Sequence, residues 1–205
     1  MKIATWNVNG IRARHTQFLE WVDSARPDVV CLQEIKASLA QVPAQICDLN
    51  GYWCYWHGGG GYSGVGLHLR RETFPQQPEF SHPQFDSETR IVQAKAGDTV
   101  FASVYVPNGG KDYEAKIGFM KSLIDYAHSF RESGSKLILC GDMNVARTDI
   151  GSVRADAEFY LKMIRALRAR ETEIVSMTSD VQRLLFCSSS ADLEVGYTWT
   201  VPPAP

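Results

Sequence analysis

One short segment near the middle of the chain constrains the fold most. Residues 136–140 are the apolar run KLILC, and residues 141–144 are the polar turn GDMN. A short apolar run that ends in a polar turn is typical of a buried strand. Along an extended segment, the side chains of Asp142 and Asn144 point the same way. We therefore expect a sheet in which a carboxylate and a carboxamide lie together at the end of a buried strand.

Two earlier segments end in a similar way. Residues 2–8 predict a strand with Asn7 on one face, and residues 28–33 predict a buried strand that leads to Glu34. Taken alone, each fits a solvated strand end or a turn-forming Asn. Glu34 is also a good single ligand for Mg²⁺, and Asn7 would add an oxygen directly or through a neighbour. Together the three strand ends predict one metal-dependent phosphodiesterase site.

The rest of the chain predicts helices alternating with hairpins. Hairpins and crossover helices of this kind favour two packed sheets with helices outside, an α/β sandwich. The further predicted elements are helices at 16–25 and 111–131 and strands at 51–56, 64–69, 90–96 and 99–106.

The pattern weakens after about residue 150. A helix at 154–170 and a strand near 197–200 are expected, and no other strand is predicted after Cys140. The prediction is one domain over 1–205, with 151–205 divergent or truncated.

Composition narrows the class of protein. With 205 residues and 44% hydrophobic content, the chain can bury one large core. The formal charge of −2 gives no global basic signature, so a polyanion must be met by local basic residues or a metal ion. No segment approaches the ~18 apolar residues of a membrane span, and the start does not resemble a secretory signal. Five cysteines without CxxC spacing favour reduced thiols in a cytosolic protein.

Two aromatic positions have alternative interpretations. Residues 59–64 formally fit G-x-G-x-x-G, but the following strand excludes a dinucleotide site, which needs a helix there. A hairpin whose amides and Tyr62 approach a sugar-phosphate backbone is favoured instead. Tyr105 ends a strand, where its phenol either donates to a phosphoryl group or packs in the sheet.

Burial of Asp142 would raise its proton affinity and suit it to orient or activate a water.

Taken together, these motifs resemble the exonuclease III family of class II apurinic/apyrimidinic (AP) endonucleases, in the endonuclease/exonuclease/phosphatase superfamily. The resemblance implies a four-layered, DNase I-like α/β sandwich. It also implies Mg²⁺-dependent hydrolysis of DNA phosphodiester bonds, at abasic sites and 3′ ends, in base excision repair, with Mn²⁺ as an alternative ion. The segments that carry it are residues 5–12, 27–36, 61–66, 105–110 and 139–144.

The resemblance also implies a role for each matching residue. It also implies double-stranded DNA with abasic sites or 3′ ends as the partner. A monomer without a membrane partner is expected, cytoplasmic at the nucleoid in a bacterium or nuclear in a eukaryote. The implied site comprises the metal positions Asn7 and Glu34, the catalytic positions Tyr105, Asp142 and Asn144, and the DNA-facing positions Arg12, Lys36 and Tyr62.

Most of the later part of the family pattern has no counterpart here, and only residues 197–200 are similar to a later family strand. Relatives carry a late aspartate and a Ser-Asp-His segment, whereas the last histidine of this chain is His128, before Asp142. The expectation is a sandwich that is incomplete at the C-terminus. Two alternatives stay open beside the nuclease: a catalytically impaired DNA-binding remnant, and a superfamily phosphodiesterase for phosphoinositides, sphingomyelin or another non-DNA substrate.

Overall fold

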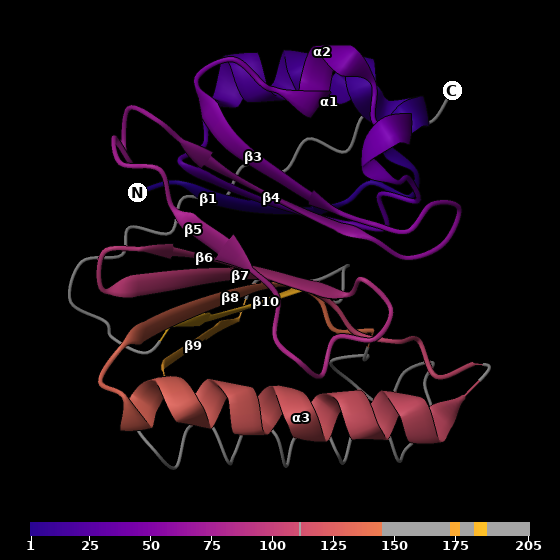
Figure 1. The fold of residues 1–205 in the computed structure, drawn as a ribbon, viewed down its shortest axis with the longest axis vertical. Coiled ribbons are helices and arrows are strands. Elements are labelled where there is room, and N and C mark those ends of the chain that lie inside the picture. The colour runs from indigo at the N-terminus through magenta and orange to yellow at the C-terminus, as the bar shows by residue number, and fades with distance from the viewer. Residues whose placement is uncertain (111, 145–172, 177–182, 188–205) are drawn as a thin grey trace.

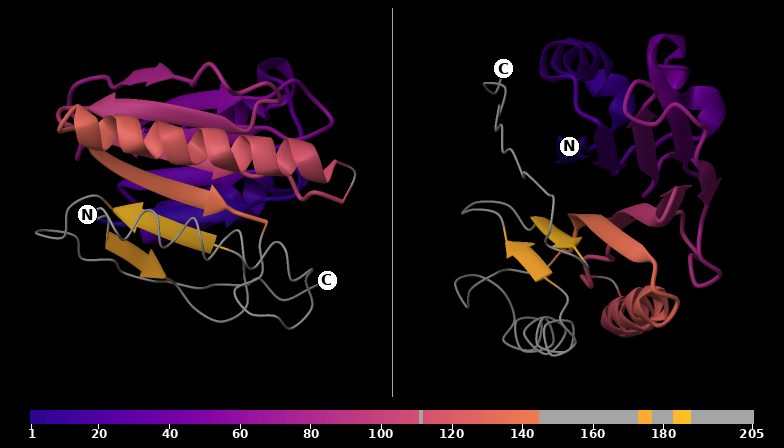
Figure 2. Two further views of the ribbon diagram at one scale, coloured as in Figure 1. Left: turned by 90° about the horizontal axis from the view of Figure 1, so that it is seen from below. Right: turned by 90° about the vertical axis from the view of Figure 1, so that its left-hand side faces the viewer.

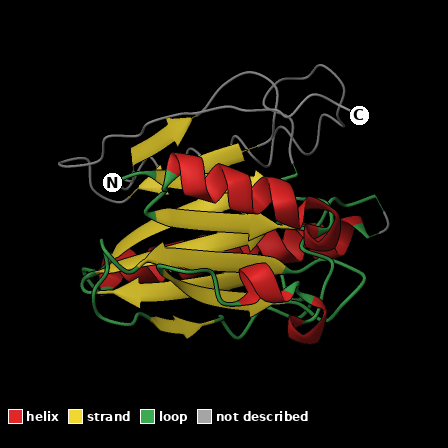
Figure 3. Ribbon diagram, turned by 90° about the horizontal axis from the view of Figure 1, so that it is seen from above, coloured by secondary structure: helices red, strands yellow, loops and turns green. Residues whose placement is uncertain are grey.

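Four layers stack on one another in the molecule (Figure 1). The computed structural model describes residues 1–110, 112–144, 173–176 and 183–187. In this part of the chain, helices α1 and α2 cover one sheet, and helix α3 covers a second sheet that faces the first. Figure 3, seen from above, shows the helices lying over the strands. This arrangement confirms the predicted four-layered α/β sandwich.

The first sheet has the strand order β1-β2-β4-β3. Strands β1 and β2 are parallel, with Asn7 opposite Gln33, and the other pairs are antiparallel. A parallel pair needs a crossover connection, which helix α1 supplies. The ends of β1 and β2 therefore lie at the same edge. The elements are β1 (Ile3–Asn7), α1 (Ile11–Ala25), β2 (Val29–Gln33), a 3₁₀ turn (Leu39–Gln41), α2 (Ala44–Cys47), β3 (Tyr52–His57) and β4 (Val65–Arg70).

The second sheet has the order β5-β6-β7-β8-β10-β9 in the described residues. Strands β7 and β8 are parallel, with Tyr105 opposite Asp142, and α3 is their crossover. The ends of this pair also lie together. The elements are β5 (Glu79–Ser81), β6 (Ile91–Ala96), β7 (Thr99–Tyr105), α3 (Tyr113–Glu132), β8 (Lys136–Asp142), β9 (Glu173–Ser176) and β10 (Arg183–Cys187).

The sequence predictions need three corrections. Helix α1 begins at Ile11 rather than residue 16, because the backbone N–H groups of Gly10 and Ile11 donate to the carbonyls after β2. The short elements α2 and β5 were not predicted. Strands β10 and β9 extend the sheet beyond β8, where no strand was expected (Figure 2). Strands of four or five residues depend on pairing with a neighbour more than on their own sequence. The predicted elements at 154–170 and 197–200 lie outside the described residues.

A buried polar bridge joins the two sheets among the apolar side chains that pack between them. Gln33 of β2 donates from Nε2 to Oγ of Ser103 on β7 at 3.2 Å, and this hydroxyl donates to the carbonyl of Leu32 at 3.1 Å. Thr5 of β1 donates to Oε1 of Gln33 at 3.1 Å. Gln33 and Ser103 are completely buried. The bridge therefore adds directional bonds to contacts that have no direction of their own.

Two further findings concern membranes and thiols. Among the described residues, no helix is both long and apolar enough to cross a bilayer. Cys31, Cys47, Cys54 and Cys140 are free, and Cys31 and Cys140 are buried in strands as predicted. Burial raises the pKa of the Cys54 thiol to about 12, so it remains protonated and unreactive.

Candidate active site

Four predicted site residues meet at one edge of the sandwich. Asn7, Tyr105 and Asp142 are the last residues of β1, β7 and β8, and Glu34 follows β2. Asn7 Nδ2 donates to Glu34 Oε1 at 2.9 Å and to Asp142 Oδ2 at 2.8 Å. The second bond crosses from one sheet to the other. A single amide group thus holds two carboxylates from different layers side by side.

Glu34 is held in its charged form. Burial alone would raise its pKa, but hydrogen bonds from Asn7, Lys36 and Tyr105, together with the Lys36 charge, outweigh burial and lower the pKa. Lys36 Nζ lies 2.8 Å from Glu34 Oε2. The carboxylate is therefore anionic at neutral pH and available to a cation.

Tyr105 is held in its neutral form. It is buried, and burial, with the charge and hydrogen bond of Glu34 and a smaller effect of Asp142, raises its pKa to about 12 against the opposing effect of Arg90. The phenol consequently keeps its proton at neutral pH. It can donate a hydrogen bond to an anionic oxygen in the site.

The loop after β8 fixes the Asp142 carboxylate. Asp142 Oδ1 accepts from the backbone N–H of Asn144 at 2.9 Å, while Oδ2 faces Asn7. Asn144 Nδ2 donates to the carbonyl of Val106 at 2.7 Å. The fully buried Lys116 of α3 donates from Nζ to the carbonyl of Asn144 at 2.9 Å. These bonds hold the Asp142–Asn144 turn against two other elements.

Gly141 explains why a glycine precedes the aspartate. A Cβ at this position would lie 1.9 Å from the carbonyl oxygen of Val104 on the neighbouring strand β7. No side chain fits at that distance, so glycine is needed for β7 and β8 to pair up to Asp142. The sequence motif thus serves the parallel pairing that places Asp142 beside Tyr105.

Backbone strain gathers around the site. Asn9, Glu34, Lys36 and Asn144 all have positive φ angles, between 44° and 53°. Non-glycine residues in this region cost about 1–3 kcal/mol each and persist where the surroundings impose the conformation. Here hydrogen bonds from both sides hold residues 34–36, including Lys36 N–H to the carbonyl of Ser63 at 2.9 Å. The observed strain fits a preorganised site.

The three predicted DNA-facing residues have different surroundings. Lys36 joins the cluster, since its Nζ also donates to Asn9 Oδ1 at 2.6 Å. Tyr62 is 56% exposed on the glycine-rich hairpin. Arg12 is exposed in the first turn of α1, and its side chain has no hydrogen bond or ion pair with any residue that the structure describes. The structure therefore brings Lys36 to the site and leaves Tyr62 and Arg12 at its margins.

Arg90 is a site residue that sequence reasoning missed. It is only 3% exposed, its Nη2 donates to the Tyr62 hydroxyl at 2.7 Å, and its guanidinium lies 5.0 Å from the centre of the Tyr105 ring. A usable signal existed in the predicted strands 90–96 and 99–106, which leave a two-residue turn at Gly97-Asp98. Ala96 pairs with Thr99, so the same register places Arg90 opposite Tyr105. The Tyr105 N–H donates to the Arg90 carbonyl at 2.7 Å.

The donor set fits a hard divalent cation. Mg²⁺ binds one or two carboxylates and completes its shell with waters and substrate phosphates. Glu34 and Asp142 supply two carboxylates that share one neighbour, Asn7. Asn7 turns its amino group to both, and its Oδ1 accepts from the Asn9 N–H at 3.1 Å. Two roles were considered for Asn7: binding the ion directly, or acting through a neighbour. The observed orientation fits the second role, in which Asn7 orients the carboxylate ligands.

The sandwich and the acid–amide cluster at its strand ends define a DNase I-like α/β protein. An AP endonuclease from Archaeoglobus fulgidus has this fold, with a TM-score of 0.71 and 23% identity over 91% of this chain and 86% of that one. The chain belongs to the Endonuclease/Exonuclease/phosphatase family, whose model matches residues 4–204.

Curated relatives confirm the resemblance to the exonuclease III family. The DNA repair nuclease APEX1 of Danio rerio is 33% identical over 158 residues, covering 73% of this chain and 51% of the relative. An exodeoxyribonuclease of Bacillus subtilis is 32% identical over 155 residues, covering 73% of this chain and 61% of the relative. The chain thus spans about half to three fifths of the length of these relatives.

Proposed function

We propose that this chain carries a Mg²⁺-dependent DNA phosphodiesterase that incises DNA at abasic sites and removes nucleotides at 3′ ends. The observation that carries the proposal is the cross-sheet cluster in which Asn7 joins the carboxylates of Glu34 and Asp142. Catalysis of phosphodiester hydrolysis depends on placing charge and hydrogen bonds around one phosphate. The names of the curated relatives favour DNA as the substrate.

Each residue has a distinct part in the proposed reaction. The buried carboxylate of Asp142, fixed by Asn7 and Asn144, orients a water and accepts its proton as the water attacks phosphorus. The bond from phosphorus to the 3′ oxygen breaks, and this oxygen takes a proton from solvent to give a 3′ hydroxyl. Tyr105, neutral because its pKa is about 12, turns its single O–H from Glu34 to a phosphate oxygen when the substrate binds. Asn144 has a second amide N–H for the same purpose.

Glu34 is the proposed metal ligand, with Asn7 orienting it. When bound, Mg²⁺, or Mn²⁺ in its place, offsets the negative charge that develops on the phosphate and the leaving oxygen. The lowered pKa of Glu34 keeps this ligand charged at neutral pH. Lys36, beside the same carboxylate, adds a fixed positive charge for the DNA backbone.

Local cations provide the proposed contact with duplex DNA. The net charge of −2 makes general attraction weak, so affinity depends on Arg12 and Lys36, with Tyr62 presenting an exposed ring. The buried Arg90 is paired with Glu88 and supports Tyr62 from behind. Phosphate contacts release counterions, and binding is therefore expected to weaken steeply with salt. We propose a monomer that acts where chromosomal DNA lies, in the bacterial cytoplasm or the eukaryotic nucleus.

Nicking of a duplex with one abasic site tests the proposal. The full chain is assayed with Mg²⁺ and with EDTA, beside Asp142→Asn and the matched control Asp23→Asn, which changes an exposed carboxylate on α1. Loss of a general base costs about 10²–10⁴ in rate. We expect Mg²⁺-dependent nicking that Asp142→Asn abolishes and Asp23→Asn retains.

Other outcomes select the alternatives. A folded chain that binds the abasic duplex but nicks none of it would establish a DNA-binding remnant and overturn the enzymatic proposal. Turnover of a phosphoinositide or of sphingomyelin, without nicking of DNA, would establish a different phosphodiesterase. Equal nicking by the wild type and Asp142→Asn would remove Asp142 from the mechanism.

A further inference from the structure

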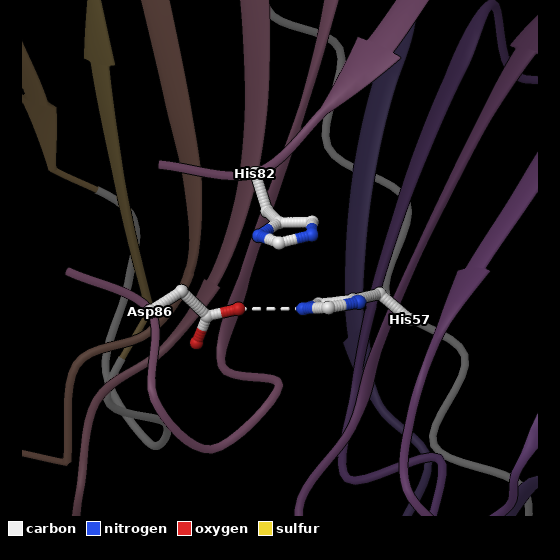
Figure 4. Close-up of side chains that lie close together, drawn as sticks. All are labelled: His57, His82 and Asp86. Atoms are coloured by element: carbon white, nitrogen blue, oxygen red, sulfur yellow. Dashed lines mark hydrogen bonds and ion pairs between the residues drawn. The ribbon is translucent and has the colours of Figure 1, made fainter. Parts of the chain in front are cut away.

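A second cluster of polar side chains lies close to the proposed active site but takes no part in it. His57 ends β3, whereas His82 and Asp86 lie in the connection between β5 and β6 (Figure 4). One ligand atom from each residue lies within 4.8 Å of the other two. The cluster thus brings the end of a strand in one sheet next to a connection of the other sheet.

Asp86 and His57 form the fixed part of this cluster. The Asp86 side chain is fully buried, and its Oδ1 accepts from the Arg90 backbone N–H at 2.8 Å. Its Oδ2 lies 2.5 Å from His57 Nε2. This pair satisfies the buried carboxylate, so burial of Asp86 needs no third residue.

His82 is the unexplained member. It is exposed, and its ring stacks on the His57 ring with centroids 4.4 Å apart and planes 16° apart. Its nitrogens form no hydrogen bond with any residue in the described part of the chain. Two imidazoles that each place a nitrogen within 4.8 Å of one buried carboxylate oxygen are a set of donors that suits a metal ion better than a simple ion pair.

We propose that His57, His82 and Asp86 form a binding site for a transition-metal cation of the Zn²⁺ or Co²⁺ type. Zinc binds imidazole nitrogen and carboxylate oxygen at about 2.0–2.2 Å, usually with four ligands. Three protein ligands leave the fourth position to water. Mg²⁺ prefers oxygen ligands alone, so this site and the Glu34 site differ in the ions that they select.

Binding requires two local changes. The ion replaces the proton between His57 Nε2 and Asp86 Oδ2, and this proton passes to solvent. The lone pair of an imidazole nitrogen lies in the ring plane, so His82 must turn out of its stack to share the ion with His57. Its exposed position leaves room for this rotation.

The bound ion would clamp two loops that reach the DNA-facing margin. His57 opens the segment that carries Tyr62, and Asp86 accepts from the backbone of Arg90, whose side chain in turn donates to Tyr62. Fixing His57 to His82 and Asp86 therefore braces both Tyr62 and Arg90. This consequence for DNA contact rests on the proposed function, whereas metal binding itself does not.

Titration of the full chain with CoCl₂ and with ZnCl₂, in buffer containing excess Mg²⁺ and no DNA, tests the site. We expect one equivalent of Co²⁺ to give the intense visible absorption of a four-coordinate ion, and Zn²⁺ to displace it. The variants are His82→Ala and Asp86→Asn, with His15→Ala as the control that removes a histidine elsewhere. Loss of a residue that only orients a ligand costs about 10- to 100-fold in affinity, so loss of a ligand should cost at least that.

Hydrogen exchange provides the structural measurement. With Zn²⁺, amides of residues 57–64 and 82–90 should exchange more slowly, and His82→Ala should remove this protection while His15→Ala keeps it. Absence of one-equivalent binding, or equal affinity in His82→Ala and His15→Ala, would overturn the proposal and leave an ordinary ion pair with a stacked histidine. Because no DNA is present, either result stands whether or not the chain is a nuclease.

Discussion

The two polar clusters of this molecule lie at the margins of the same two sheets but are built differently. Asn7, Tyr105 and Asp142 are strand residues, and strand pairing fixes their positions. His82 and Asp86 lie in a connection, and only Asp86 is held by the backbone of a neighbour. The first cluster offers oxygen ligands in a rigid arrangement, and the second offers imidazoles of which one is free to turn. Sites on strands gain precision, whereas sites on loops gain adjustability.

The sharpest contrast between the clusters is expected in catalysis. Glu34→Gln removes the charged metal ligand, and we expect abasic-site nicking to fall by about 10²–10⁴. Asp86→Asn leaves the strand ends unchanged. It should lower the rate by less than about tenfold, because it reaches the site only by weakening the support of Arg90. Single-turnover nicking at saturating Mg²⁺ measures both. A larger loss in Asp86→Asn than in Glu34→Gln would contradict the division between the two clusters.

Stability should separate a strand glycine from a loop glycine. Gly141→Ala forces a Cβ against the Val104 carbonyl, 1.9 Å away, and is expected to lower the free energy of unfolding by about 3 kcal/mol or more. Gly97 lies at a hairpin turn with φ +66° and open space around it. Gly97→Ala should lower the free energy of unfolding by only about 1–2 kcal/mol, because the cost comes from the left-handed backbone conformation alone. Urea unfolding measures the difference. Equal losses would show that β7 and β8 separate readily near the site.

Asp28, at the opposite end of β2 from Glu34, provides a carboxylate without proposed metal chemistry. Burial would raise its pKa, but hydrogen bonds from Thr73 and the Lys2 N–H, with the charge of Arg70, lower it below 3.8. Its contribution to stability is therefore complete above pH 3.8 and is lost as pH falls through the lowered pKa. Asp28→Asn should lower the free energy of unfolding by about 1–3 kcal/mol at neutral pH, and progressively less below pH 3.8. Urea unfolding at several pH values measures the difference. A difference that grows on acidification would reverse the sign of this prediction.

The smallest expected effect concerns the Tyr105 phenol. Its pKa of about 12 reflects burial first and then the charge and hydrogen bond of Glu34. Glu34→Gln removes the charge and should lower the pKa, leaving the burial effect. Ultraviolet titration of tyrosinate measures this pKa. The titration curve of the Tyr105→Phe variant is subtracted from that of its parent, once for the wild type and once for Glu34→Gln. An unchanged pKa would mean that Glu34 and Tyr105 are not coupled.

The same contrast explains how much the sequence could predict. The strands and the residues at their ends were predictable, because apolar runs with polar terminal residues mark both the strand and its end. Arg90 was within reach through the hairpin register. The meeting of His57 with His82 and Asp86 was not, because it depends on how two sheets stack and on the path of a connection with no periodic pattern. Strands β9 and β10 were missed because they are short and depend on β8 for pairing.

The bridge between Gln33 and Ser103 has a consequence for the chemistry at a distance. Apolar contacts between the layers have no preferred direction, so hydrogen bonds that cross the interface help to fix the lateral position of one sheet against the other. Half of the proposed site belongs to one layer and half to the other, so a small slip would move Glu34 past Tyr105 and Asp142. Displacements of about 1 Å can cost about a hundredfold in rate. The alignment of the reacting groups thus depends not only on the Asn7–Asp142 bond in the site but also on two uncharged side chains that lie within the interface and never meet the substrate.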